Sequence, residues 1–410
     1  MNIFSIIILA TLAVDFILNL VADYYNLSSL NTGLPDEFSD VYDEETYEKS
    51  QEYTKERTKF GIISSTFNLI LLLAFWFAGG FNWLDTIVGG WQLGTIWTGL
   101  AYIGILLLGK SILSLPFSIY STFVIEEKYG FNKTTPKTFV LDLLKGLGLA
   151  VILGGPLLAG ILAFFTYVDQ YAWLYAWAAV TAFTLFVQFV APTWIMPIFN
   201  DFEPLEDGDL RTKIREYAEK VNFALEGIYV MDGSKRSSKS NAFFTGFGKN
   251  KRIALYDTLI ENHEDEELVA VLAHEIGHYK RKHIIKNMLA SIAQTGVMFF
   301  LLSIFLNSQG LYDAFYMDQM SVYAGLIFFG MLYAPIEMIL SIVMQVLSRK
   351  YEFEADAFAS STYRKEPMIE ALKKLSKDNL SNLRPHPFYV FLNYSHPPVL
   401  ERIKAIRALE

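Results

Sequence analysis

Seven long stretches of the chain carry almost no charge, and this pattern limits its possible folds more than any other feature. They are 2–22, 60–80, 98–122, 144–165, 173–198, 285–306 and 322–348. A helix of about 20 apolar residues spans the roughly 30 Å hydrocarbon core of a bilayer. Charged residues make up only 19% of the chain, whereas soluble domains have about 25%. The sequence therefore predicts a mainly α-helical, polytopic membrane protein with about seven transmembrane helices.

Net charge and cysteine content exclude two further classes. The chain has 34 Lys and Arg against 43 Asp and Glu, a net charge of −9. Nucleic-acid binding depends on basic surfaces, so we expect no nucleic-acid partner. The chain has no cysteine, which excludes disulfides, thiolate metal ligands and cysteine nucleophiles.

The distribution of lysine and arginine between the spans predicts the orientation. Three connecting loops contain neither residue: 81–96, 166–171 and 307–321. The segments that alternate with them contain several or many: 23–59, 123–143, 199–284 and 349–410. Positively charged loops stay in the cytoplasm as a rule. We therefore expect the N-terminus outside and both long polar segments in the cytoplasm.

Four segments follow from this division. Residues 1–198 contain spans one to five and the cytoplasmic loops 23–59 and 123–143, and residues 285–348 contain spans six and seven. Residues 199–284 form a cytoplasmic segment, and residues 349–410 form a cytoplasmic C-terminal segment. Polar residues also occur inside the spans: Asp15, Lys110, Gln188, Gln294 and Glu337. A charge that faces lipid is costly. These groups therefore either line a water-filled interior or pair for packing, with Lys110 alternatively extending its ammonium group to the membrane surface, and the sequence leaves these possibilities open.

The segment 199–284 alternates between helical and strand-like patterns. We expect a helix over 206–223, a strand over 227–232, and a hairpin of 241–247 and 252–257 with Gly248, Lys249 and Asn250 at its turn. A further helix begins near 263 with an acidic first turn, which suits the positive end of the helix dipole. We expect it to continue through Lys280, Arg281 and Lys282 directly into the sixth span.

That helix carries the pattern His274-Glu275-Ile-Gly-His278. Histidines four residues apart lie on one helix face, so both imidazoles can reach one Zn²⁺. The glutamate beside the first histidine is placed to take a proton from a water that the metal activates. The alternative is a pair of surface histidines on an amphipathic helix.

A catalytic zinc needs a third protein ligand and an open position. Glu352 and Asp356, just after the seventh span, also lie four residues apart on one face. One can ligate the metal while the other accepts the second ring N–H of a ligating histidine. Glu354 points elsewhere on that helix. Both segments emerge at the cytoplasmic membrane surface, so the sequence predicts one shared metal site.

The other histidines have weaker signals. We expect His283 to be interfacial, His263 to be a capping or surface residue, and His386 to lie in a loop. His396 lies in the segment Tyr-Ser-His-Pro-Pro at 394–398, ahead of a helix. On its own, such a histidine is more often structural than catalytic.

Taken together, these motifs resemble the type I CAAX prenyl proteases, which are integral-membrane zinc metalloproteases. The matching segments are HEIGH at 274–278, EFEAD at 352–356, SNAFFTGFGKNKRIALYDTL at 240–259, YSHPPVLERI at 394–403, EEKYGFN at 126–132 and PTWIMPIFNDFEPL at 192–205. The related HtpX-type heat-shock membrane peptidases share the first two segments but have fewer spans.

The resemblance implies a cytoplasmic gluzincin-type metalloprotease domain with a small β-hairpin or sheet, and one zinc ion per chain. It assigns His274, His278 and Glu352 as zinc ligands, Glu275 as the general base, and Asp356 as the group that orients His274. Asn241 and Ala242 would lie on an edge strand that pairs with the substrate backbone. His396 would approach the developing oxyanion, with Arg402 holding that region.

The resemblance also implies the reaction, which is removal of the last three residues of prenylated C-a-a-X proteins. The expected partners are a lipid bilayer and a peptide or membrane-anchored protein substrate, with or without a prenyl group. A broad-specificity protease for membrane-protein quality control is one alternative, and a transporter or receptor with an incidental HEIGH segment is another. The chain lacks cysteine and ends in Arg-Ala-Leu-Glu, so we favour a prokaryotic plasma membrane over the endoplasmic reticulum.

Overall fold

The computed structural model describes residues 1–30, 33–245 and 252–409. Within them, seven helical segments are long and apolar enough to cross a membrane. They are α1 (Ile3–Ser28), α2 (Glu44–Phe77), α4 with a π-helical end (Thr95–Glu126), α5 to α6 (Pro136–Tyr167), α7 to α8 (Ala172–Phe199), α12 (His283–Phe305) and α14 (Val322–Thr362). Each overlaps one predicted span, so the predicted number of membrane helices is confirmed.

Several of these helices extend beyond the apolar stretch that predicted them. In α2, the Asp43 side chain accepts a hydrogen bond from the Thr46 backbone N–H at 2.6 Å, and Glu44 and Glu45 occupy the first turn. An acidic cap of this kind stabilises a helix start. The helix therefore begins in the polar segment well before residue 60, where the apolar run starts.

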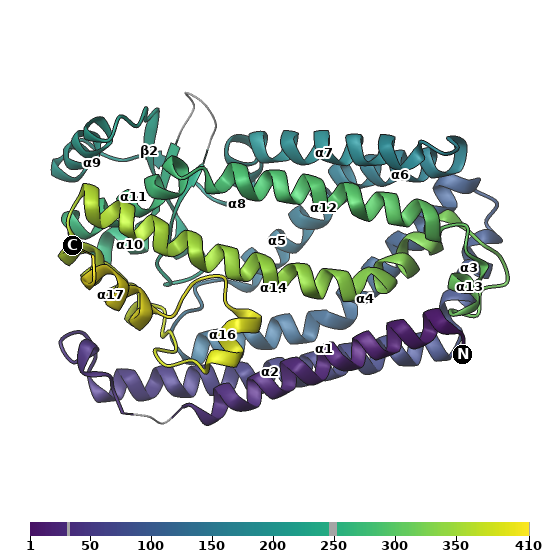
Figure 1. The fold of residues 1–410 in the computed structure, drawn as a ribbon, viewed down its shortest axis with the longest axis horizontal. Coiled ribbons are helices and arrows are strands. Elements are labelled where there is room, and N and C mark those ends of the chain that lie inside the picture. The colour runs from purple at the N-terminus through teal and green to yellow at the C-terminus, as the bar shows by residue number, and fades with distance from the viewer. Residues whose placement is uncertain (31–32, 246–251, 410) are drawn as a thin grey trace.

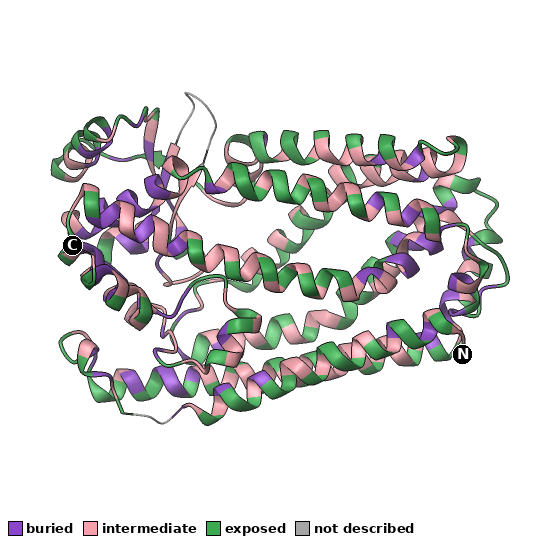
Figure 2. Cartoon of the chain, in the orientation of Figure 1, coloured by how far each residue is buried: buried purple, intermediate pink, exposed green. Residues whose placement is uncertain are grey.

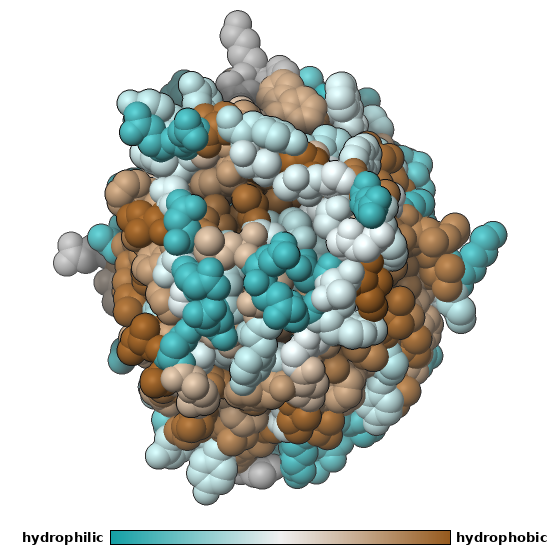
Figure 3. Space-filling view, turned by 90° about the vertical axis from the view of Figure 1, so that its right-hand side faces the viewer, coloured by the Kyte–Doolittle hydropathy of each residue, from teal (hydrophilic) through white to brown (hydrophobic). Residues whose placement is uncertain are grey.

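The membrane helices lie roughly along the long axis of the molecule (Figure 1). The polar elements gather at one end: α9 (Asp209–Lys220), α10 (Asp257–Asn262), α11 (Asp265–Lys280), α15 (Lys365–Asp378) and α17 (Val399–Arg407). The short, mostly apolar helix α16 (Pro387–Asn393) lies inward from that end, against α1 and α14. The N-terminus lies at the opposite end with α3 (Gly80–Gly89) and α13 (Gln309–Asp313). Figure 3 shows polar side chains over the middle of that opposite end and apolar ones along its flanks.

The chain has two large cores, one at each end (Figure 2). The α11 core surrounds α11 and includes Ile214, Leu255, Leu268, Ala273 and Ile276. The outer core joins the membrane helices near α3 and α13 and includes Trp76, Phe81, Tyr102, Phe315 and Phe328. Between them, few residues in the apolar parts of the spans are buried. The helices are therefore held mainly at their two ends.

A four-stranded sheet with the order β1-β2-β4-β3 lies beside α11. Strand β2 (Gly227–Met231) pairs antiparallel with β1 (Phe202–Pro204) and parallel with β4 (Arg252–Tyr256). Strand β3 (Ala242–Thr245) pairs antiparallel with β4 and forms one edge. The predicted strand and hairpin are confirmed, whereas β1 was missed because three residues show no periodicity. The predicted turn at Gly248, Lys249 and Asn250 lies outside the described residues.

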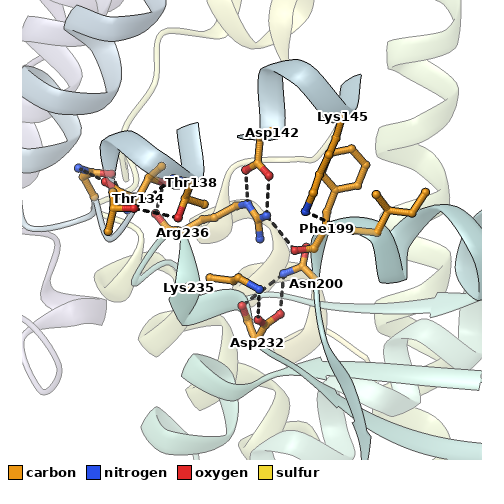
Figure 4. Close-up of polar contacts among 12 residues, drawn as sticks. Thr134, Thr138, Asp142, Lys145, Phe199, Asn200, Asp232, Lys235 and Arg236 are labelled. Atoms are coloured by element: carbon orange, nitrogen blue, oxygen red, sulfur yellow. Dashed lines mark hydrogen bonds and ion pairs between the residues drawn. The ribbon is translucent and has the colours of Figure 1, made fainter. Parts of the chain in front are cut away.

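A polar junction ties this sheet to the membrane helix α5 (Figure 4). Arg236, in the segment after β2, donates to both carboxylate oxygens of Asp142, at 2.7 and 2.9 Å. Its guanidinium also donates to the Phe199 carbonyl at 2.8 Å, and Lys145 donates to the Ile198 carbonyl at 2.7 Å. A bidentate pair of this kind fixes orientation as well as distance. The junction thus sets the position of the sheet relative to the spans.

Two of the polar residues inside the spans pair with each other, as one of the two expectations has it. Gln294 of α12 donates a hydrogen bond to Glu337 of α14 at 3.0 Å, so these two pair between helices. The side chains of Asp15, Lys110 and Glu337 are nevertheless exposed, not packed among apolar neighbours.

Candidate metal centre

Helix α11 begins with a reciprocal capping box. Glu264 and Glu267 each accept a hydrogen bond from the other's backbone N–H, and the first turn is acidic. Ten of its residues are buried, from Glu267 to Gly277. The HEIGH segment is therefore part of a helix that the α11 core surrounds, and the alternative of a surface histidine pair does not hold.

A glycine lets α11 approach α14 closely. A Cβ at Gly277 would lie 3.1 Å from both the Cα and the carbonyl oxygen of Ala355. Ala273 on α11 and Ala359 on α14 are also buried. These small side chains allow the two backbones to meet, and the close contact brings the two candidate ligand segments together.

The three expected ligands converge. The Nε2 atoms of His274 and His278 lie 3.1 Å apart, and each is 3.3 to 3.4 Å from an oxygen of Glu352. A tetrahedron with bonds of about 2.0 Å has edges of about 3.3 Å, so this spacing suits a tetrahedral cation such as zinc. Glu352 is 3% exposed, and within the described residues its oxygens have only long contacts, at 3.3 to 3.4 Å to imidazole nitrogens and 3.5 Å from Oε2 to Nη1 of Arg402. A buried carboxylate needs closer partners than these, so the donor set fits a bound metal.

Asp356 and Arg402 support the first histidine from behind. Asp356 is 1% exposed, and its Oδ1 lies 2.8 Å from Nδ1 of His274. Arg402 of α17 donates to both Asp356 oxygens, at 2.6 and 2.8 Å. Burial by itself lowers the pKa of His274, but its hydrogen bonds to Asp356 and Glu352 outweigh burial and raise that pKa to about 9.

Two further candidates lie beside the three ligands. Glu275 is half-buried, and burial raises the pKa of its carboxyl although the neighbouring imidazoles oppose the shift. The raised pKa makes Glu275 a stronger base than an ordinary carboxylate. Nε2 of His396 is 3.4 Å from Glu352, and its Nδ1 is 2.9 Å from the Ser395 hydroxyl. His396 and Arg402 also line a recess of about 500 Å³.

Asn241 and Ala242 lie where the edge strand begins. Ala242 is the first residue of β3, and the Asn241 carbonyl accepts a hydrogen bond from the Tyr256 N–H at 3.1 Å. Strand β3 pairs with β4 on one side only. The structure thus brings the expected edge strand next to α11, against whose core Ala242 packs.

The expectation of one helix running into the sixth span is wrong. Helix α11 ends at Lys280, and Lys282 has a φ of 58°, in the left-handed region, before α12 starts at His283. A non-glycine residue there breaks the helical path. This turn could not be predicted from the sequence, because neither Gly nor Pro marks it.

The break places His283 in a position that the sequence analysis missed. His283, expected to be interfacial, is 2% exposed, with Nδ1 3.0 Å from Nδ1 of His278 and Nε2 3.0 Å from Glu354. His263, expected to cap or lie on the surface, is the C-cap residue of α10, with its Nδ1 3.1 Å from the Leu259 carbonyl, but it is buried and not on the surface. The spacing of five residues between His278 and His283 carries no helical signal, so only the turn brings them together.

Comparison with known proteins covers most of the chain. Residues 23–201 match the family model described as CAAX prenyl protease N-terminal, five membrane helices, and residues 204–410 match peptidase family M48. The chain is 38% identical to CAAX prenyl protease 1 homolog of Arabidopsis thaliana, over 91% of this chain and 90% of that one. It is 36% identical to CAAX prenyl protease 1 of Saccharomyces cerevisiae, over 93% and 90%.

A solved structure agrees at the level of the fold. The crystal structure of S. mikatae Ste24p superposes with a TM-score of 0.92, at 35% identity, and covers 99% of both chains. The human CAAX prenyl protease 1 homolog is 33% identical over 92% of this chain and 90% of its own. The resemblance noted in the sequence is therefore confirmed along nearly its entire length.

Proposed function

The chain belongs to the CAAX prenyl protease family of M48 membrane metalloproteases, and on this premise we propose that it removes C-terminal residues from prenylated CAAX proteins with zinc as its metal. We assign His274, His278 and Glu352 as the ligands. The observation that carries the assignment is the 3.1 to 3.4 Å spacing of their donor atoms. A transporter or receptor function is excluded by membership of a peptidase family.

The proposed chemistry divides between the metal and the side chains around it. When bound, the metal supplies a Lewis acid that polarises the scissile carbonyl and acidifies a water. Glu275 takes a proton from the attacking water and passes it to the leaving amine, a task that its raised pKa favours. His396 donates a hydrogen bond to the oxygen on which negative charge develops.

The remaining site residues hold these groups in place. Asp356, itself clamped by Arg402, accepts the Nδ1–H of His274 and so leaves Nε2 free to face the metal. The Ser395 hydroxyl contacts Nδ1 of His396 and limits rotation of that ring. Asn241 and Ala242 present a strand edge to which an extended substrate backbone can add as a further strand.

The central test uses two variants of the full-length protein in detergent. Glu352→Ala should lose bound zinc, because the only carboxylate among the three ligands is removed. Glu275→Gln should keep zinc and lose turnover of a farnesylated CAAX peptide. Glu261→Gln, an exposed glutamate on α10, is the matched control and should behave as wild type. Full turnover by Glu275→Gln would refute its role as the base.

Substrate choice separates this proposal from its nearest alternative, a quality-control protease of broad specificity. A prenyl-dependent enzyme should cleave a farnesylated CAAX peptide much faster than the same peptide without the prenyl group. Equal rates on the two peptides would favour the alternative.

We also propose the orientation that the lysine and arginine distribution predicts, with the N-terminus outside and α11 in the cytoplasm. The prokaryotic plasma membrane is the location predicted from the sequence. The relatives named above are eukaryotic, which supports the alternative of the endoplasmic reticulum. Protease protection of a tag fused at either end in sealed, right-side-out membrane vesicles tests the orientation: a tag at the N-terminus should be cleaved and a tag at the C-terminus protected, and inverted vesicles should give the reverse.

A further inference from the structure

His283 contacts His278 of the candidate metal centre, whereas Asp356 contacts His274. It begins α12, directly after the turn at Lys282, and its ring is stacked on Tyr351 at 4.1 Å and 12°. One ring nitrogen faces His278 and the other faces Glu354, both at 3.0 Å. A histidine that is 2% exposed and uses both nitrogens in this way is held in one orientation.

The ring hydrogens of His278 and His283 can be assigned from the geometry of the candidate ligands. Nε2 of His278 faces Glu352 and His274, so it must present a lone pair to a cation. A neutral imidazole then carries its hydrogen on Nδ1, which donates to His283. Nδ1 of His283 must therefore accept, and its own hydrogen lies on Nε2, which donates to Glu354.

We propose that His283 is a positioning residue for the metal: it accepts the Nδ1–H of His278, and Glu354 holds the proton of His283 on the far nitrogen. The inference rests on the proposed function, because it assigns how one of the ligands of that same site is oriented. His274 is supported directly by a carboxylate, and His278 is supported by a carboxylate acting through a second imidazole.

The inference gives each acidic residue of the segment Glu-Phe-Glu-Ala-Asp a task at one centre. Glu352 faces both Nε2 atoms, Asp356 supports His274, and Glu354 supports His278 through His283. Glu354 lies on a different face of α14 from the other two, since residues two apart are about 200° apart around a helix. The turn at Lys282 brings the start of α12 beside that face of α14, so His283 can contact Glu354.

The competing explanation is that His283 only fills space against Tyr351. Two substitutions separate packing from hydrogen bonding. His283→Phe keeps an aromatic ring for Tyr351 but offers no acceptor to His278. His283→Asn loses the ring, but its amide oxygen occupies nearly the position of Nδ1 and can accept the same hydrogen.

The experiment measures Zn²⁺ affinity by chelator competition on metal-stripped, full-length protein, and records the absorption spectrum of the Co²⁺-loaded form. We expect His283→Phe to bind Zn²⁺ about 10- to 100-fold more weakly, as is usual when the support of a metal-ligating histidine is lost, and to alter the Co²⁺ spectrum. We expect His283→Asn to stay close to wild type in both. Lys350→Gln, beside Glu354 on the surface of α14, is the control and should leave both unchanged.

Glu354→Ala provides a second route, because this partly exposed side chain can be removed with little risk to folding. It should weaken Zn²⁺ binding in the same direction as His283→Phe, by a smaller factor. The inference would be overturned if His283→Phe kept the wild-type Zn²⁺ affinity and Co²⁺ spectrum. It would also be overturned if His283→Phe and His283→Asn weakened Zn²⁺ binding equally. If wild type binds Zn²⁺ and cleaves peptide in those cases, only this inference fails. If wild type binds no Zn²⁺, the proposed function fails with it.

Discussion

Helix α14 is buried at its two ends in cores of different character, and its middle is buried in neither. At the outer end, the buried residues are aromatic or small, with Phe328 stacked on Phe315 at a centroid distance of 3.9 Å. At the end beside α11, they are small or acidic: Glu352, Ala355, Asp356, Ala359 and Ser360. In between, large apolar side chains such as Ile339 and Val343 remain exposed.

The difference shows that burial has two purposes in one helix. The outer core removes large apolar surfaces from solvent and so contributes stability. At the contact with α11, the buried side chains of α14 are small or acidic, and the two backbones come close enough for the proposed ligands on each helix to meet. Substitutions at the two ends should therefore have different consequences, and substitutions in the middle should have few.

The largest effect should come from separating α11 and α14. Gly277→Val places a branched side chain against the backbone at Ala355, which cannot move aside as a flexible side chain could. We expect peptide hydrolysis to fall about 100-fold, because displacement of catalytic groups by about 1 Å has that cost. Gly330→Val, on α14 where a Cβ meets nothing within 4 Å, is the matched control. Equal activity in the two variants would show that the close approach is unnecessary.

A large-to-small change in the outer core should lower stability and leave the metal centre intact. Phe328 is fully buried, so Phe328→Ala should destabilise the fold by about 3 to 5 kcal/mol. Thermal unfolding in detergent measures this loss, and chelator competition at a temperature where the variant is folded should give the wild-type Zn²⁺ affinity. A large drop in affinity would mean that the two cores are coupled along α14.

The stability of the region around α11 should depend on pH through a buried histidine, His263. Burial lowers the pKa of His263, although Asp378 and Glu267 nearby oppose the shift and Lys374 adds to it. In the unfolded chain the imidazole of His263 takes up a proton near pH 6.5, about the ordinary pKa of histidine. In the folded protein His263 stays neutral to a lower pH, because its pKa is lowered. Its contribution to stability is complete above about pH 6.5 and is lost as the pH falls toward the lowered folded-state pKa.

The measurement is the melting temperature of wild type and His263→Asn between pH 7.5 and 5. Burial raises the pKa of Asp378, so this carboxyl works in the opposite direction in both proteins, and their difference isolates His263. The gap between wild type and variant should narrow as the pH falls. A constant gap would contradict the assignment.

The smallest effect should come from the middle of α14. Ile339 is 60% exposed, and Ile339→Ala should change stability by no more than about 0.5 kcal/mol. Melting temperature and peptide hydrolysis should both match wild type. A clear loss of activity alone would reveal that this stretch contacts the substrate.

Much of the site could be predicted from local spacing. His274 and His278, four residues apart on a helix, must share a face wherever that helix lies, and so must Glu352 and Asp356. Residue spacing left open which of the two carboxylates faces the metal, because both lie on the same face. The contact with α11 decides that Glu352 meets the Nε2 atoms and Asp356 meets Nδ1 of His274.

What the sequence by itself determined is everything that depends on the composition or period of one segment: seven membrane helices, the strand and hairpin, and two helix faces bearing donor atoms. Only the tertiary structure decided how those faces meet. Gly277 sets the distance between the helices, and the turn at Lys282 makes His283 a neighbour of His278 and Glu354. The physical reason is that periodicity specifies which residues share a face, whereas contacts between helices depend on backbone approach and chain direction, which no single segment encodes.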